Sequence, residues 1–156
     1  MKLILISSLA FIVAYLIIYI NRYGVPVTFS HTYKIIKQKW AFTVVLTIFG
    51  VSLALNADTT MFFFCGALLC LVGVSRHYWE PGEKTLHFIG AIGSVLLGMA
   101  SLIIDFQNYW ALPAFLVFYL LFEDIFSSGP IIKIKNHTFY TEIVGFLLLA
   151  ISLLII

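Results

Sequence analysis

Residues 85–104 read TLHFIGAIGSVLLGMASLII, a run of 20 amino acids without Asp, Glu, Lys or Arg. A helix of about 20 mostly apolar residues is long enough to cross the hydrocarbon core of a bilayer. Five more stretches share this apolar character, and each is predicted to form a spanning helix: Leu3–Ile20, Trp40–Asn56, Thr59–Ser75, Tyr109–Phe122 and Phe139–Ile156. The sequence therefore predicts an all-α, polytopic bundle of six transmembrane spans, with residues 1–156 forming a single domain.

The overall composition excludes an ordinary soluble domain. Hydrophobic residues make up 62% of the chain and charged residues only 10%, and the mean hydropathy is +1.08. Soluble domains carry roughly 25% charged residues, because their surface is hydrated. Nine Lys and Arg residues are too few both to orient six helices and to form a phosphate-binding surface. We therefore expect the lipid bilayer, and no nucleic acid, as a partner.

The connections between the predicted spans indicate an orientation. Short and long connections alternate, and the long ones are residues 21–39, 76–84 and 123–138. Eight of the nine basic residues lie in or beside these long connections: Arg22, Lys34, Lys37, Lys39, Arg76, Lys84, Lys133 and Lys135. Only Lys2 falls on the opposite face. Because Lys and Arg concentrate in cytoplasmic loops, this pattern predicts a multi-pass membrane protein with both termini outside the cytoplasm.

The first long connection contains a helix-capping signal. Ser30 precedes the segment that leads into the second span. Serine is among the preferred N-cap residues because its hydroxyl accepts a hydrogen bond from an unpaired backbone N–H of the first turn. We predict that Ser30 caps a helix that begins at His31 and continues into the second span.

The fourth predicted span carries small and polar residues at helical spacing. Steps of four, three, four, three and four residues join His87, Ala91, Ser94, Gly98, Ser101 and Asp105. At 3.6 residues per turn these positions form one stripe along a helix. Either the stripe allows close helix packing, or it lines a polar cavity or path. The second span has a similar stripe of Thr43, Thr47, Gly50 and Ala54, which makes it the predicted packing partner.

Glu142 is the most informative acidic residue. It lies one turn inside the last predicted span, and a charged side chain in lipid costs several kcal/mol unless it is paired or functional. An ion pair with Lys133 or Lys135 is one interpretation, and a role in binding is the other. The predicted binding site or polar stripe therefore consists of His87, Ser94, Ser101, Asp105 and Glu142.

The four histidines provide a second, metal-based hypothesis. His31, His77, His87 and His137 all fall on the predicted cytoplasmic side. Three histidines with a carboxylate bind zinc, whose open fourth position activates a water molecule. The sequence has no HExxH or other closely spaced ligand motif, so zinc is an alternative here, and the main prediction is a protein without a cofactor.

Three short passages resemble a known group of proteins. They are GVPVTFSHTY at Gly24–Tyr33, GVSRHY at Gly73–Tyr78 and LHFIGA at Leu86–Ala91. Together they are similar to small, uncharacterised six-span membrane proteins of Bacteroidetes and their phages. The resemblance implies a prokaryotic inner membrane and gives no activity.

A fainter similarity connects the chain to membrane hydrolases of the alkaline ceramidase type. Those enzymes use Ser, Asp and three His residues around zinc, and Ser30, His87 and Asp105 are of the matching residue types. The chain departs from the pattern in two ways. It lacks the paired-histidine motif of that family's last helix, and Asp105 is predicted on the opposite side of the membrane from His87.

Three functional hypotheses remain open at the level of sequence. The first is a non-catalytic module that binds or conducts a small solute or lipid, with a homo-oligomer as one form of it. The second is a metal-dependent membrane enzyme that acts on a lipid. The third is an accessory subunit that binds another membrane protein.

Overall fold

The computed structural model describes residues 2–75, 81–105, 107 and 136–155. Every regular element in this part of the chain is a helix: α1 (Lys2–Tyr23), α2 (His31–Ile35), α3 (Lys39–Leu55), α4 (Thr60–Val74), α5 (Pro81–Ile104) and α7 (His137–Ile155). The all-α class is thus confirmed, and the five predicted spans that fall here coincide with α1, α3, α4, α5 and α7 to within four residues at each end. The predicted span Tyr109–Phe122 lies outside the described residues.

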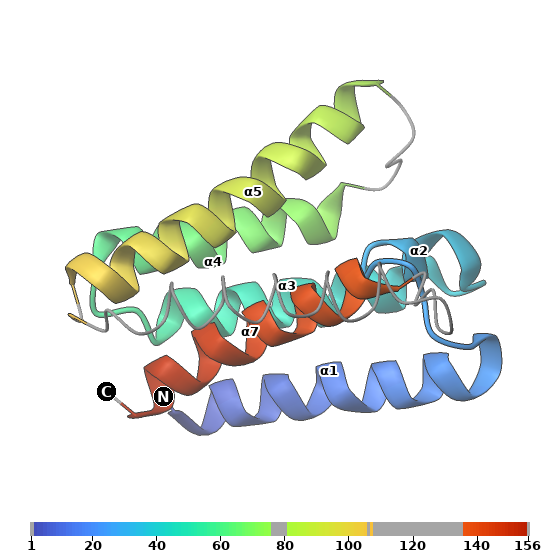
Figure 1. The fold of residues 1–156 in the computed structure, drawn as a ribbon, viewed down its shortest axis with the longest axis horizontal. Coiled ribbons are helices and arrows are strands. Elements are labelled where there is room, and N and C mark those ends of the chain that lie inside the picture. The colour runs from blue at the N-terminus through green and yellow to red at the C-terminus, as the bar shows by residue number, and fades with distance from the viewer. Residues whose placement is uncertain (1, 76–80, 106, 108–135, 156) are drawn as a thin grey trace, which may run out of the picture.

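The long helices lie side by side; α1, α3, α4 and α5 alternate in direction, and α7 runs in the same direction as α5 (Figure 1). The start of α1 and the end of α7 lie at the same end of the bundle, where Lys2 Nζ donates a hydrogen bond to the Leu154 carbonyl at 3.1 Å. Helix α4 packs against both α3 and α5, and α7 contacts α5 and α1. The short helix α2, the start of α3 and the start of α5 lie at the other end (Figure 1).

Glycines bring α3 and α4 into backbone contact. A Cβ atom at Gly50 would lie 2.6 Å from the carbonyl oxygen of Gly66, and one at Gly73 would lie 2.9 Å from Thr47 Oγ1. Small residues let helix backbones approach this closely. The predicted pairing of this α3 stripe with α5 is therefore wrong, because α4 covers the stripe. Residue spacing identifies a small face but not the helix that meets it.

The small face of α5 packs against two other helices. A Cβ atom at Gly90 would lie 2.8 Å from Val72 Cγ2 on α4, and one at Gly98 would lie 2.6 Å from Leu149 Cδ2 on α7. The stripe on α5 thus allows close packing along part of its length. Met99 of α5, which is not part of the stripe, is also only 4% exposed.

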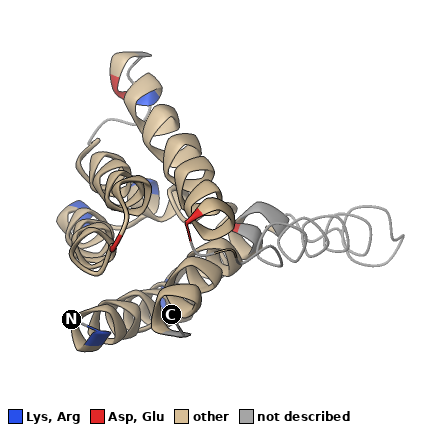
Figure 2. Ribbon diagram, turned by 90° about the vertical axis from the view of Figure 1, so that its left-hand side faces the viewer, with Lys and Arg blue, Asp and Glu red and all other residues tan. Residues whose placement is uncertain are grey.

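The outward-facing side chains are strongly apolar. On α1, Phe11 and Ile18 are each 57% exposed, and on α5 Ile89 is 55% exposed. Among the described residues, two helices are long and apolar enough to cross a membrane, namely α1 and Gly82–Ile104 of α5. Glu142 is the only described charged residue that lies more than a turn inside a helix, while the others lie at helix ends or in connections. Figure 2, which looks down the bundle, shows how sparse the charged residues are on the described helices.

The connection between α1 and α3 differs from the prediction at Ser30. Helix α2 has five residues and ends at Ile35, with Ile36 as its extended C-cap residue, so it does not continue into α3. Ser30 makes no side-chain capping bond. Instead, Thr28 Oγ1 accepts the hydrogen bond from the His31 N–H at 3.0 Å. The Ser30 hydroxyl is turned toward His87 on α5, and this contact belongs to the site described next.

Candidate functional site

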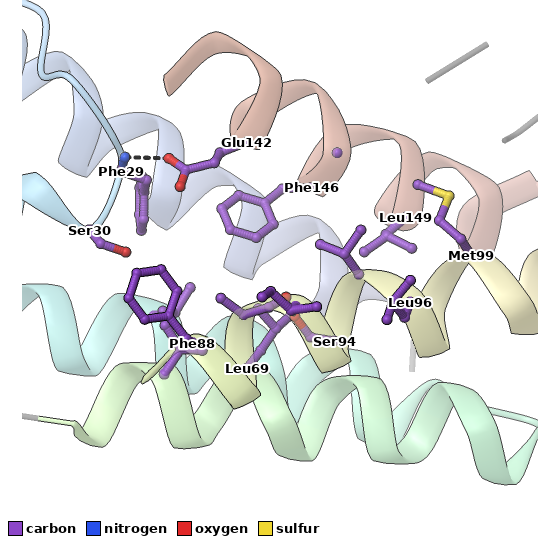
Figure 3. Close-up of a pocket in the computed structure, with 16 residues that line it drawn as sticks. Phe29, Ser30, Leu69, Phe88, Ser94, Leu96, Met99, Glu142, Phe146 and Leu149 are labelled. Atoms are coloured by element: carbon purple, nitrogen blue, oxygen red, sulfur yellow. Dashed lines mark hydrogen bonds between the residues drawn. The ribbon is translucent and has the colours of Figure 1, made fainter. Parts of the chain in front are cut away.

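A cavity of about 410 Å³ lies between α5 and α7 (Figure 3). Helices α3 and α4 and the connection before α2 complete its wall. Apolar side chains make up most of the lining, among them Leu46, Leu69, Val95, Met99, Phe146 and Leu149. Protein sites for small molecules have volumes of roughly 300–1,000 Å³ and are mostly apolar with a few placed polar groups. The cavity has the size and character of such a site.

The polar groups of the cavity are unevenly distributed. The polar residues in the described part of its lining are Ser30, Ser94 and Glu142. Ser30 and Glu142 lie together at one end, whereas Leu96 and Leu149 lie toward the other end (Figure 3). The lining on α5 runs from Phe88 to Met99, a distance of about 16 Å at 1.5 Å per residue. The cavity is therefore an elongated apolar chamber with one polar end.

The side chain of Glu142, on α7, bonds to a backbone N–H at the polar end of the cavity. Its Oε2 atom accepts a hydrogen bond from the Phe29 N–H at 2.5 Å. The Phe29 side chain is 2% exposed, and its ring contacts Phe42 and Phe146 at centroid distances of 5.5 and 5.6 Å. A buried backbone N–H needs an acceptor, and the carboxylate supplies it. The predicted ion-pair partners Lys133 and Lys135 lie outside the described residues.

His87 is held between two serines. Its Nε2 atom lies 2.9 Å from Ser30 Oγ, and its Nδ1 atom lies 3.2 Å from Ser75 Oγ. The imidazole side chain is only 4% exposed. Three separate segments meet here, since Ser30 precedes α2, Ser75 follows α4 and His87 belongs to α5. The cavity thus has a buried, hydrogen-bonded imidazole directly behind one of its lining hydroxyls.

The other predicted stripe residues belong to different surroundings. Ser94 lines the cavity, but its hydroxyl donates to the Ala91 carbonyl of its own helix at 2.9 Å. At the far end of α5, Ser101 Oγ donates to Asp105 Oδ2 at 2.5 Å and lies 2.8 Å from Thr59 Oγ1. The 18 residues from His87 to Asp105 span about 27 Å along a helix. The structure therefore brings His87 and Glu142 to the polar end and leaves Ser101 and Asp105 in a separate cluster.

The zinc hypothesis stays untested. Within residues 2–75, 81–105, 107 and 136–155, no group of three or more His, Cys, Asp or Glu side chains is arranged to hold a metal ion. His87 is hydrogen-bonded to two serines, and His31 Nδ1 is buried without a hydrogen-bond partner in this part of the chain. His77 and the His137 side chain lie outside the described residues.

Two components of the site carry no usable signal in the sequence. Ser75 is the C-cap residue of α4, and nothing in its neighbourhood distinguishes it from a solvated helix end. Phe29 contributes a backbone N–H, which every residue except proline has. Both become recognisable only once helices distant in the chain are packed together.

No protein-family model, no curated protein and no solved structure matches this chain. The resemblance of its three short passages therefore stays a prediction, and the function is argued from the cavity.

Proposed function

We propose that this chain is a six-span inner-membrane protein with both termini on the periplasmic side. Three observations support the proposal: the apolar outer faces of α1 and α5, the length of these two helices, and the shared position of the termini. The described charges are also asymmetric. Five of the six described Lys and Arg residues lie at the end of the bundle that holds α2: Arg22, Lys34, Lys37, Lys39 and Lys84. Lys2, Asp58 and Asp105 lie at the other end.

Reporter fusions test the orientation. Alkaline phosphatase joined after Ile156 should be active, because it folds only outside the cytoplasm, and green fluorescent protein at the same site should be dark. As a control, the same reporters joined after Gln38, in the basic connection, should give the opposite pattern. Fluorescence from the fusion after Ile156 would overturn the orientation.

Within the bundle, we propose that the cavity binds one apolar chain of a lipid or of another amphipathic molecule. The observation that carries the proposal is the elongated apolar chamber with Ser30 and Glu142 at one end (Figure 3). An ion or a polar solute needs polar groups along its whole path to replace its hydration shell. Here the polar lining is concentrated at one end, which suits a molecule with one polar end and a long apolar part.

Packing energetics favour occupancy of this cavity. Side chains that line an unfilled volume lose the van der Waals contacts that they would otherwise make on that side. In a bilayer, lipid chains are the apolar molecules at hand, and helix interfaces there are stabilised mainly by such packing and by hydrogen bonds. An acyl chain lying along Val95, Met99 and Leu149 would restore these contacts. Its polar end would then lie beside Ser30 and Glu142.

Filling the cavity should therefore displace the bound lipid. In Ala91→Phe, the new ring projects from a lining position of α5, and we expect the Kd for the lipid to rise at least about tenfold, a loss of roughly 1.4 kcal/mol in binding free energy, so that the fraction of protein that carries a bound lipid falls. Native mass spectrometry of protein extracted in a mild detergent measures that fraction. Ile89→Phe adds a ring to the same helix at a 55% exposed position and should retain the lipid. Equal occupancy in both variants would contradict the proposal.

A further inference from the structure

The contact between Ser30 and His87 has the geometry of a nucleophile beside its base. Ser30 Oγ lies 2.9 Å from His87 Nε2, within the 2.6–3.2 Å range over which a histidine takes a proton from a serine. A third residue orients the imidazole, since Ser75 Oγ lies 3.2 Å from Nδ1 on the other side of the ring. Nucleophile, base and orienting group are the three parts of this catalytic arrangement.

The hydrogen bonds of Ser75 determine where the imidazole proton lies. Ser75 Oγ is 2.8 Å from the Val72 carbonyl and 3.1 Å from the Leu71 carbonyl. A hydroxyl has one proton to donate, and carbonyl oxygens only accept, so this proton is used within α4. Toward His87, Ser75 Oγ therefore accepts, and the Nδ1–H of the ring donates. The lone pair of the neutral ring is then on Nε2, which faces the Ser30 hydroxyl.

The position of Ser30 connects this pair to the cavity. Ser30 lines the cavity at its polar end (Figure 3), whereas His87 is buried behind it at 4% exposure. In an ester lipid, the carbonyl group joins the apolar chain to the polar part of the molecule. A chain that fills the apolar part of the cavity thus brings its ester carbonyl to the end where Ser30 lies.

We propose that Ser30 is the nucleophile and His87 the general base in the hydrolysis of an ester lipid whose acyl chain occupies this cavity. This inference rests on the binding function proposed above. Ser30 Oγ attacks the ester carbonyl carbon, and its proton passes to His87 Nε2. The bond from that carbon to the alcohol oxygen breaks, and the alcohol leaves with the proton from Nε2. Water then attacks acyl-Ser30 while His87 takes its proton, and the Ser30 oxygen recovers that proton as the fatty acid is released.

A fluorophosphonate probe tests the nucleophile directly, because it forms a covalent bond with activated serines. The full chain in mild detergent should be labelled, and peptide mapping by mass spectrometry should place the label on Ser30. Labelling should disappear in Ser30→Ala and slow about 100-fold in His87→Gln, the lower range of what a positioned base contributes. Ser7→Ala, which removes an exposed hydroxyl of α1 bonded to the Leu3 carbonyl of its own helix, should be labelled at the wild-type rate.

The mapping experiment on the wild-type chain decides the proposal even if His87→Gln fails to fold. A folded wild-type protein without a label on Ser30 would overturn it, as would a wild-type labelling rate in a folded His87→Gln variant. Lipid occupancy separates this inference from the proposed binding function. Native mass spectrometry of the wild-type chain measures that occupancy. If the protein carries a lipid but Ser30 is not labelled, only the assignment of Ser30 as nucleophile is contradicted. If Ala91→Phe is labelled at the wild-type rate, the cavity is not the site where the acyl chain binds.

Discussion

Replacing Gly66 by leucine should unfold the pair of helices at the centre of the bundle. A Cβ atom at this position would overlap the carbonyl oxygen of Gly50 and would lie 2.6 Å from the Ala54 N atom. Both are backbone atoms of α3, so no change of side-chain rotamer relieves the clash. Insertion of extra atoms into a packed core usually costs 1–3 kcal/mol, and separation of two backbones costs more. We expect a loss of at least about 3 kcal/mol.

Thermal unfolding in detergent measures this effect. A loss of about 3 kcal/mol corresponds to a fall in Tm of roughly 10 °C for a chain of this size. Ala67→Leu is the matched control, because the neighbouring residue of α4 is exposed on the outer surface and should leave the Tm within a few degrees. A Gly66→Leu variant that melts with the wild-type protein would show that α3 and α4 do not meet through Gly50 and Gly66.

The predicted helices illustrate what an apolar sequence determines. In a bilayer, the backbone N–H and C=O groups of a spanning segment have no water to bond to. A long apolar run therefore forms a helix, in which these groups hydrogen-bond to one another. The run at 85–104 accordingly lies within α5, which starts four residues earlier at Pro81. Proline suits the first turn because its missing N–H would have no helical partner there.

The pairing of the helices is not determined by the same signal. Gly50 and Gly98 both signal close approach, yet only the tertiary structure shows that α4 covers the first and that Leu149 of α7 meets the second.

The candidate site was predictable in part. His87 and Glu142 are polar residues in predicted spans, and the cost of a polar side chain in lipid singles them out without any structure. The fainter hydrolase resemblance included both Ser30 and His87 as residue types, but the local sequence at Ser30 predicted a helix cap and not a contact with His87. Its hydroxyl instead reaches His87, 57 residues later in the chain. Such a contact has no periodicity, and it is visible only when α5 packs beside the connection before α2.

Reversal of the charge at Glu142 should be the most damaging change at the polar end. In Glu142→Lys the ammonium group has three donors and no acceptor, so the buried Phe29 N–H loses its partner. An unsatisfied buried donor costs about 1–3 kcal/mol. A lysine at the centre of a span costs roughly 2.5–3.5 kcal/mol, although its long stem reduces this by reaching toward the headgroups. We expect a loss of about 3 kcal/mol in stability and a lower fraction of lipid-bound protein.

Two control variants divide this effect into its causes. Glu142→Gln keeps a side-chain oxygen that accepts from the Phe29 N–H, so its stability should stay within about 1 kcal/mol of the wild type, the net worth of a typical hydrogen bond. Asp58→Lys makes the same change of charge in the exposed turn between α3 and α4 and should change stability by less than about 0.5 kcal/mol. If Glu142→Gln were as unstable as Glu142→Lys, the negative charge and not the contact with Phe29 would stabilise this end of the cavity. In that case a cationic group, on the bound molecule or on the chain, would have to lie beside the carboxylate, since a negative charge in an apolar site is stable only when it is paired.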